Sequence, residues 1–313
     1  MSVAHLRRVA RGEKGLLPEG GSYGHFVHVM LLSICAFLSL SKFALSGEFA
    51  TPKDVTVDIL VSLPRDMTKS RDLNNFDLGP DGVPIVLDGP DLLVLGANKK
   101  FHTFSDLSVS NFAWMRNGSL LVVSQDQLAD LGPGGLTLGP TLPSTQMRIR
   151  AAGANTAYVF GGANEPGNHN VYVLARDKTF LKLITLPTPV VDVTGDGATH
   201  YIATSRSLLR IGVPDGIAIL LQTSDDIISI ASSSQGGVFY ATRTGVGYVE
   251  KSGAPFEFIR GQSGVLRVQG SSLYFLATPG PQLFRIGPIE RFEGLVASSA
   301  ELHPHKATGS APP

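Results

Sequence analysis

Apolar and polar residues alternate in short runs along most of the chain, and these runs recur at a nearly constant interval. The run "SLLRIG" at Ser207–Gly212 returns as "QLFRIG" at Gln282–Gly287. Related runs end at Leu95, Leu131, Leu174, Ile211, Val249 and Ile286, at intervals of 36, 43, 37, 38 and 37 residues. Six copies of one pattern at a nearly fixed period indicate a repeat architecture.

Each repeat carries the signals of four short β-strands. A turn dipeptide such as Asn117-Gly118 or Asp196-Gly197 precedes a β-rich run upstream of every copy. Asn-Gly and Asp-Gly between apolar runs favour the tight turns of β-hairpins. A further apolar strand lies on each side of this hairpin, so about 37 residues predict one four-stranded antiparallel blade. Such a blade cannot bury both faces alone, and several must therefore stack around an axis.

The pattern over residues 55–292 resembles six-bladed propellers of the NHL and gluconolactonase-like kind. The predicted fold is therefore all-β, a six-bladed β-propeller of four-stranded antiparallel blades over residues 55–295, preceded by an N-terminal apolar segment. The repeats lack the Trp-Asp ending of WD40 repeats. Because propellers carry hydrolases, lyases and plain binding platforms alike, this resemblance implies a fold and no particular activity.

The ring must also close, since an open ring would leave an apolar face and an unpaired strand edge in water. "VTVDILVSLP" at Val55–Pro64 precedes the first complete blade and has the pattern of an outermost strand. We expect it to pair with the last blade around Gln282–Phe292, although "IERFEGL" from Ile289 competes for the same position. Residues 296–313 have no apolar period and predict a flexible tail.

Composition is typical of a folded domain and gives little direct information on function. Lys plus Arg and Asp plus Glu are each 26 of 313 residues, so the overall charge gives no indication of a nucleic-acid partner. The single Cys35 excludes an intrachain disulfide and leaves the redox compartment open. No phosphate-binding loop is present, and no cofactor is expected.

The N-terminal region predicts export. Residues 1–25 are basic, with Arg7, Arg8, Arg11 and Lys14, and "FVHVMLLSICAFLSLS" at Phe26–Ser41 has no charged residue. Residues 26–45 are therefore interpreted as a signal peptide or a single membrane anchor. The uncharged run is longer than the apolar core of most signal peptides and shorter than most membrane spans, so its length does not distinguish the two. Basic residues before the run keep the N-terminus cytoplasmic, so the propeller would be extracytoplasmic: periplasmic, lumenal or secreted. The competing interpretation is a buried N-terminal strand or helix.

Candidate binding residues lie on the six strands expected to line the central channel. Alternation marks the polar interruptions of these strands, which are Asp77, Asn111, Arg148, Arg150, Asp192 and Arg267. The arginines could bind a carboxylate or phosphate through forked hydrogen bonds, whereas two acids beside three arginines oppose a metal site. Alternatively, the arginines pair with Asp77, Asp192 or backbone carbonyls. No catalytic residue is predicted.

Two functions are consistent with the sequence. The first is an exported, non-catalytic propeller, tethered to the membrane or released, that serves as a binding or scaffold module for a protein or glycan partner. The alternative is a propeller hydrolase or lactonase with a metal-dependent site in the central channel, for which Asp77, Asp192 and Asn111 would be the ligands.

Overall fold

A computed structural model describes eleven stretches of the chain. These are residues 48–63, 75–105, 107–132, 135–153, 155–162, 167–195, 199–212, 216–250, 254–278, 282–293 and 302–305. The predicted basic segment and apolar segment, residues 1–45, lie outside the described residues. Within the described stretches, no helix is both long enough and apolar enough to cross a bilayer.

The described chain forms six antiparallel sheets. Five of them contain four strands that are consecutive in the sequence, and the sixth combines three consecutive strands with a strand from the N-terminal part of the chain. Blade 1 comprises β3 (Asn75–Leu78), β4 (Pro84–Asp88), β5 (Asp91–Leu95) and β6 (Phe101–Ser105). Blade 2 comprises β7 (Asn111–Trp114), β8 (Leu120–Ser124), β9 (Gln127–Gly132) and β10 (Gly135–Thr141). Blade 3 comprises β11 (Arg148–Ala151), β12 (Ala157–Phe160), β13 (Asn170–Leu174) and β14 (Phe180–Thr185).

The second half of the ring follows the same plan. Blade 4 comprises β15 (Val190–Gly195), β16 (Thr199–Thr204), β17 (Ser207–Gly212) and β18 (Gly216–Gln222). Blade 5 contains β19 (Ile227–Ser232), β20 (Val238–Thr242), β21 (Gly245–Val249) and β22 (Phe256–Arg260). Blade 6 contains β23 (Ser263–Gln269), β24 (Ser272–Thr278) and β25 (Gln282–Gly287), completed by β2 (Thr56–Ser62).

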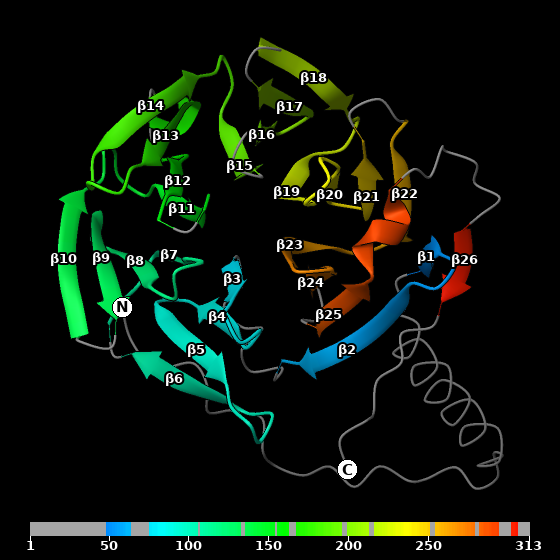
Figure 1. Cartoon of the computed structure of the whole chain (residues 1–313), viewed down its shortest axis with the longest axis horizontal. Coiled ribbons are helices and arrows are strands. Elements are labelled where there is room, and N and C mark those ends of the chain that lie inside the picture. Colours follow the sequence, from blue (N-terminus) through cyan, green and yellow to red (C-terminus); the bar gives the residue numbers. More distant parts are fainter. Residues whose placement is uncertain are drawn as a thin grey trace, which may run out of the picture. The chain divides into compact units, whose positions relative to one another are not determined.

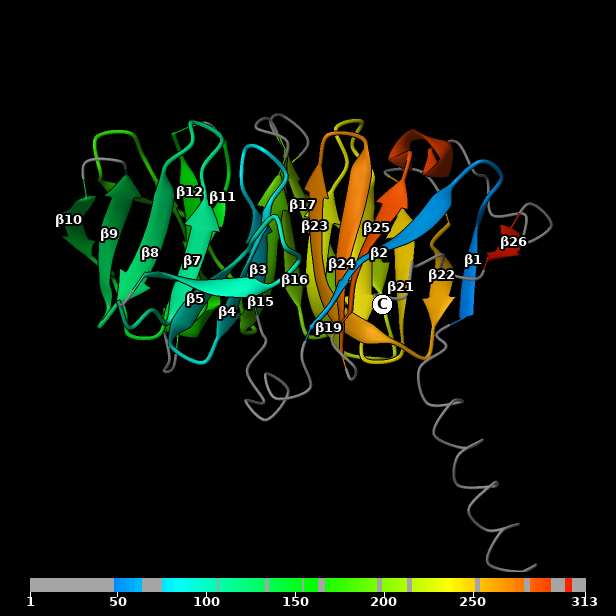
Figure 2. The same cartoon turned by 90° about the horizontal axis from the view of Figure 1, so that it is seen from below.

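The six blades stand around a central axis, with the first strand of each blade innermost (Figure 1). These innermost strands are β3, β7, β11, β15, β19 and β23, and each lies at one end of the strand order of its sheet. Figure 2 shows the ring from the side, with the strands of successive blades steeply inclined to the plane of the ring. The predicted six-bladed propeller and its predicted innermost strands are confirmed.

Apolar residues are buried between the blades and explain why the blades stack. The buried apolar residues fall into six clusters, and each cluster joins two neighbouring blades. In β12, Ala157 and Val159 pack toward blade 2, while Tyr158 and Phe160 pack toward blade 4. Because successive residues of a strand face opposite sides, a blade between two others needs apolar residues at every position of its central strands.

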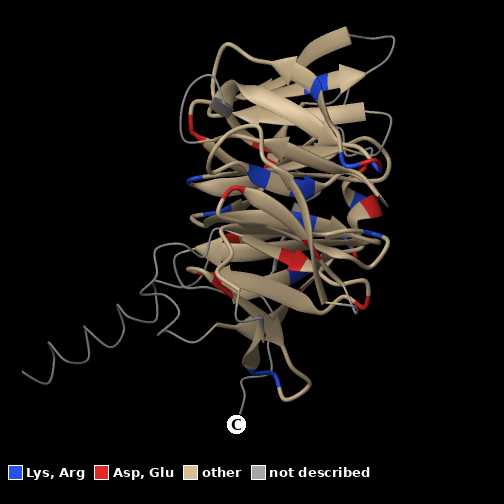
Figure 3. Ribbon diagram, turned by 90° about the vertical axis from the view of Figure 1, so that its left-hand side faces the viewer, with Lys and Arg blue, Asp and Glu red and all other residues tan. Residues whose placement is uncertain are grey.

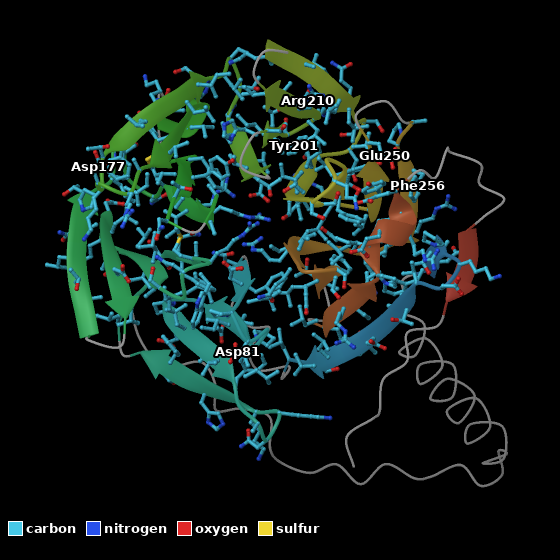
Figure 4. The ribbon with its side chains drawn as sticks, in the orientation of Figure 1. Asp81, Asp177, Tyr201, Arg210, Glu250 and Phe256 are labelled. Atoms are coloured by element: carbon cyan, nitrogen blue, oxygen red, sulfur yellow. The ribbon has the colours of Figure 1, made fainter. Side chains whose placement is uncertain are left out.

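The ring closes through β2, the predicted returning strand. It pairs antiparallel with β25, from Thr56 opposite Gly287 to Ser62 opposite Gln282. Val57 and Val61 are buried by this pairing, against blade 5 and blade 1 respectively. The competing segment from Ile289 is not a strand, since Ile289–Phe292 forms the short 3-10 helix η3. Phe292 is anchored in the blade 5 aromatic cluster, where its ring stacks on that of Phe256, labelled in Figure 4.

Two strands lie outside the predicted limits of the propeller. β1 (Glu48–Pro52) pairs with β22, and β26 (Leu302–His305) pairs in turn with β1, which extends the blade 5 sheet to six strands. Residues 302–305 of the predicted tail are therefore part of a sheet, and the remainder of the tail lies outside the described residues. The added strands cover the outer edge of β22, where an unpaired strand edge would otherwise remain.

Removing residues 1–63 should open the ring and lower its thermal midpoint by about 10 °C or more. Burial of side chains such as Val57 and Val61 is worth about 1.5–3 kcal/mol each, and each kcal/mol shifts the midpoint of a domain of this size by about 2–4 °C. Calorimetry of the purified variants measures the shift. Removing residues 1–47 retains β1 and β2 and serves as the control. Equal midpoints for the two truncations would disprove the closure by β2.

Candidate functional site

The innermost strand of every blade has one edge without a partner strand, and this edge faces the channel. Its backbone N–H and C=O groups therefore need other hydrogen-bond partners. Side chains from the preceding blade supply them: Asn111 Oδ1 accepts the Ile149 N–H at 3.0 Å, and Ser229 Oγ accepts the Leu266 N–H at 3.1 Å. These bonds span 38 and 37 residues, which is one repeat of the sequence.

Asp77 and Asn75 make the same kind of connection from blade 1 to blade 2. Asp77 Oδ2 accepts the Trp114 N–H at 2.8 Å, and the Asn75 amide donates to the Phe112 carbonyl at 3.0 Å. We call the polar side chains that join innermost strands in this way the channel belt: Asn75, Asp77, Asn111, Arg148, Arg150, Asp192, Ser229 and Arg267. Figure 4 shows side chains of the innermost strands reaching toward the axis of the ring.

Arg150 is the belt residue with the widest reach. Its Nη1 contacts the two carboxylate oxygens of Asp192 in blade 4 at 2.6 and 2.8 Å. Its Nη2 donates to the Ile230 carbonyl of blade 5 at 2.7 Å and to the Leu266 carbonyl of blade 6 at 3.0 Å. A single guanidinium from blade 3 thus binds three further blades, which the planar fork of arginine allows and a lysine ammonium does not.

Asp192 is surrounded by donors. Besides Arg150, its carboxylate accepts the Ser229 hydroxyl and the Ile230 N–H, both at 2.9 Å. Burial raises the pKa of Asp192, but Arg150, Arg267, the Ile230 N–H and Arg148 together hold this pKa below its ordinary value. Asp192 is therefore a buried, ionised partner of the arginines, and a cation approaching its oxygens would have to displace Arg150.

Arg267 closes the belt between blade 6 and blade 1. It donates through Nη1 to the Leu266 carbonyl at 2.7 Å and through Nη2 to Asn75 Oδ1, and its Nε lies 3.7 Å from Asp77 Oδ1. Its guanidinium also lies over the Phe76 ring, 5.4 Å from the centroid. Burial and the neighbouring Arg150 lower the pKa of Arg267 to about 10, against the effect of Asp77, so the side chain stays charged at neutral pH.

Arg148 and Asn111 do not meet the other candidate residues in one ligand site. Arg148 donates to the Val190 carbonyl at 3.1 Å and lies over the Phe160 ring. Burial lowers the pKa of Arg148, Asp192 raises it, and Arg150 adds to the lowering. The structure therefore brings Arg150 together with Asp192, and Arg267 with Asp77, while Asn111 and Arg148 each serve a separate junction between blades.

A cavity of about 650 Å³ opens where the innermost strands end. Its polar and charged lining residues include Asp77, Arg116, Arg150, Thr194, Ser232, Ser234, Arg267, Gln269 and Glu290. The cavity lies directly against the belt arginines, since Arg150 and Arg267 form part of its wall. A volume of this size is typical of sites for small molecules, which occupy roughly 300–1,000 Å³.

Sequence reasoning missed Asn75, Ser229, Thr194 and Gln269. Thr194 Oγ1 lies 3.1 Å from Ser232 Oγ across blades 4 and 5, and the Gln269 amide donates to the Gly79 carbonyl at 2.8 Å across the ring closure. Each of these residues lies on an innermost strand, so its position within the repeat could have indicated a role in the channel. Residue type alone does not indicate this role, because hydroxyl and amide side chains are also common in turns.

Charge over the remaining surface is mixed. Both basic and acidic residues are scattered over the side of the ring shown in Figure 3. Among the described residues, no group of three or more His, Cys, Asp or Glu side chains lies close enough together to hold a metal ion.

Comparison with known proteins gives the fold and no closer relationship. No protein-family model and no curated protein sequence matches the chain. Among solved structures, a gluconolactonase from Xanthomonas campestris is similar with a TM-score of 0.59 and 13% identity, covering 77% of this chain and 94% of that one. Regucalcin from Agrobacterium tumefaciens, described as a calcium-binding protein, has a TM-score of 0.53 and 15% identity, covering 77% and 93%.

A virginiamycin B lyase from Staphylococcus aureus is also similar, with a TM-score of 0.52 and 11% identity, covering 67% of this chain and 78% of that one. The chain is thus similar in fold to gluconolactonase-like propellers, as the sequence pattern predicted. At these identities the likeness shows the fold alone, and the fold supports several chemistries.

Replacing Arg150 with Met should lower the free energy of unfolding by about 3–5 kcal/mol, because it leaves Asp192 charged and buried without its partner. The matched control is Arg285→Met, since Arg285 pairs with Asp58 at 2.8 Å, a distance similar to that of the Arg150–Asp192 pair, but on the exposed side of the closing strands. That change should cost no more than about 1 kcal/mol. Urea unfolding measures both variants, and equal losses would contradict the structural role of Arg150.

Proposed function

We propose that the protein is an exported, non-catalytic β-propeller that serves as a binding or scaffold module. This proposal rests on the hydrogen bonds that the channel side chains make. The carboxylates and guanidinium groups that could perform chemistry are used in hydrogen bonds between blades, while a polar cavity stays open beside them. This arrangement favours a rigid frame with a ligand site over a set of catalytic groups.

The alternative, a hydrolase with a metal in the channel, is less consistent with this geometry. Its least unfavourable ligands are Asp77, Asp192 and Asn111. Oxygens of all three already accept backbone N–H groups, and Asp192 is in addition held by a guanidinium. A divalent cation needs several free oxygen ligands, and the adjacent arginines repel it.

The export part of the proposal rests on the N-terminal sequence. The uncharged run Phe26–Ser41 follows four basic residues, a distribution that retains the N-terminus in the cytoplasm and exports the chain beyond the run. The propeller is formed by residues that follow this run in the chain. A membrane-tethered or released propeller would therefore meet its partners outside the cytoplasm.

Metal analysis of protein purified without chelator should find less than stoichiometric calcium and zinc, and calorimetric titration with either ion should show no saturable binding. The reason is that a cation in the channel would have to displace guanidinium groups from both acids. The variant for comparison is Asp77→Asn, which retains the size of the side chain. One metal ion per chain, lost in Asp77→Asn, would contradict the proposal and support the hydrolase.

A reporter enzyme that is active only outside the cytoplasm, fused after residue 313, should be active in cells. A cytoplasm-dependent reporter at the same position should be inactive, because the uncharged run directs export. As a control, deletion of residues 26–45 should reverse both results. Activity of the cytoplasm-dependent reporter on the full chain would disprove export.

A further inference from the structure

The outer rim of the ring exposes large apolar side chains on some blades and not on others. Among the described residues there are six such side chains, and all lie on the outermost strands of blades 1 to 4: Phe104 on β6, Leu136 and Leu138 on β10, Leu181 on β14, and Ile217 and Ile219 on β18. In blades 5 and 6 the outer strands are segments from remote parts of the sequence, β1 with β26, and β2. The apolar rim is thus confined to blades that no such segment covers.

An outermost strand also has one row of backbone N–H and C=O groups that no neighbouring strand binds. In blade 5 the chain covers this row itself, since β1 pairs with β22 and β26 pairs with β1. β6, β10, β14 and β18 each stand at the end of their sheet, with no further strand from the described stretches. Figure 1 shows β10, β14 and β18 along the perimeter of the ring. These edges are placed to accept a strand from another molecule.

Three of the four edges carry a feature that opposes strand pairing. β14 has Lys182 near its middle, and β10 is interrupted by Pro140, which has no N–H and lies within a register shift of the ladder. β6 exposes only one large apolar residue, Phe104, whose ring already lies edge-on against that of Trp114 at 6.1 Å. β18, Gly216–Gln222, contains neither a charged residue nor a proline. Of these four edges it is therefore the least protected.

The exposed part of β18 has a symmetric pattern. Ile217 and Ile219 are each 59% exposed, and they flank Ala218, which is also exposed. Ile217 lies opposite Ile211 of β17, and Ile219 lies opposite Leu209, so both isoleucines are on the face of blade 4 that packs toward blade 3. The apolar face of this blade therefore continues to its outer edge.

We propose that β18 pairs antiparallel with β18 of a second copy of this chain, about a two-fold axis at Ala218. In this register Ile217 of each copy lies opposite Ile219 of the other, and Ala218 lies opposite its own counterpart. Directly opposite residues of an antiparallel pair share one face of the sheet, so the four isoleucines would contact one another. Two four-stranded blades would then form one continuous sheet of eight strands.

A second copy suits this edge because the strand is complementary to itself. β18 has no Lys, Arg, Asp or Glu, so self-pairing brings no like charges together, whereas self-pairing of β14 would bring two copies of Lys182 together. A two-fold contact of this kind closes with two copies and does not continue into a fibre. Leu181, 58% exposed, would add to the apolar contact from the side of β14 that faces blade 4, where it lies opposite Val173.

Sedimentation velocity of the full chain over a range of concentrations measures this association. An interface built on one pair of strands is small, so we expect a reversible dimer with a dissociation constant of about 1–100 µM. Ile219→Lys should raise this constant at least about tenfold, because it places two ammonium groups on the shared apolar face.

The matched control is Leu138→Lys, since Leu138 is 63% exposed and is the fourth residue of β10, as Ile219 is of β18. This change should leave the dimer unaffected. Both variants should keep the thermal midpoint of the unmodified protein at concentrations where it is monomeric, because both side chains are exposed in the monomer.

Cross-linking tests the register of the pair. In a chain with Cys35→Ser, which removes the one native thiol, Ala218→Cys should yield a covalent dimer with a short thiol-to-thiol cross-linker. Opposite Cα atoms of an antiparallel pair are about 4.5–5.5 Å apart, which such a reagent spans. The control is Thr137→Cys at the equivalent position of β10, which should give only the background of random collisions.

Each contrary result would overturn the proposal. These results are a chain that stays monomeric at every concentration, equal weakening by Ile219→Lys and Leu138→Lys, or equal cross-linking at positions 218 and 137. A dimer that no substitution in β18 weakens would instead indicate association elsewhere, such as through the uncharged run Phe26–Ser41, and would overturn it as well. The inference goes beyond the proposed function and does not depend on it, since a catalytic propeller could pair in the same way.

Discussion

The unpaired inner edges of the blades are the constraint on which the rest of this structure depends. A blade begins with a strand that has no neighbour on the channel side, and six such strands surround one narrow space. Their N–H and C=O groups would be costly if left without partners. The chain meets this requirement with side chains of the preceding blade and with Arg150, which reaches the carbonyls of Ile230 and Leu266 from blade 3. The polar residues of the channel therefore have a structural purpose before any functional one.

The same belt also explains the unusual position of the arginines. Carbonyl groups of Ile230 and Leu266 need donors, and Arg150 supplies two of them while it neutralises Asp192. Replacing such a pair with apolar residues can be neutral in energy, but removing one partner is costly. The belt therefore sets the register of blades 3 to 6 relative to one another, and the apolar clusters between the blades supply most of the favourable burial.

The sequence allowed the architecture to be predicted because the repeat is a local signal. A nearly constant interval, turn dipeptides and a leftover strand at Val55 together specify blades, innermost strands and the closing pair with β25. The candidate residues were found by alternation within a strand. Their partners were not, because Arg150 reaches Leu266 across 116 residues and Arg267 reaches Asn75 across 192. No spacing within one repeat encodes contacts that exist only after the ring has closed. β26 was missed for a related reason, since a four-residue strand containing Pro304 has no apolar alternation of its own.

Amide hydrogen exchange at Ile230 and Leu266 tests the structural role of the channel belt most directly. Both N–H groups lie on an inner edge that no strand covers, and they donate to Asp192 and Ser229 respectively. We expect both to exchange slowly, and we expect Ser229→Ala to accelerate exchange at Leu266 by at least about tenfold, since a lost hydrogen bond contributes about 1.5 kcal/mol. Amides within the β23–β24 ladder should be affected less. Rapid exchange at both positions in the unmodified protein, or exchange at Leu266 that Ser229→Ala leaves unchanged, would contradict this role of the belt.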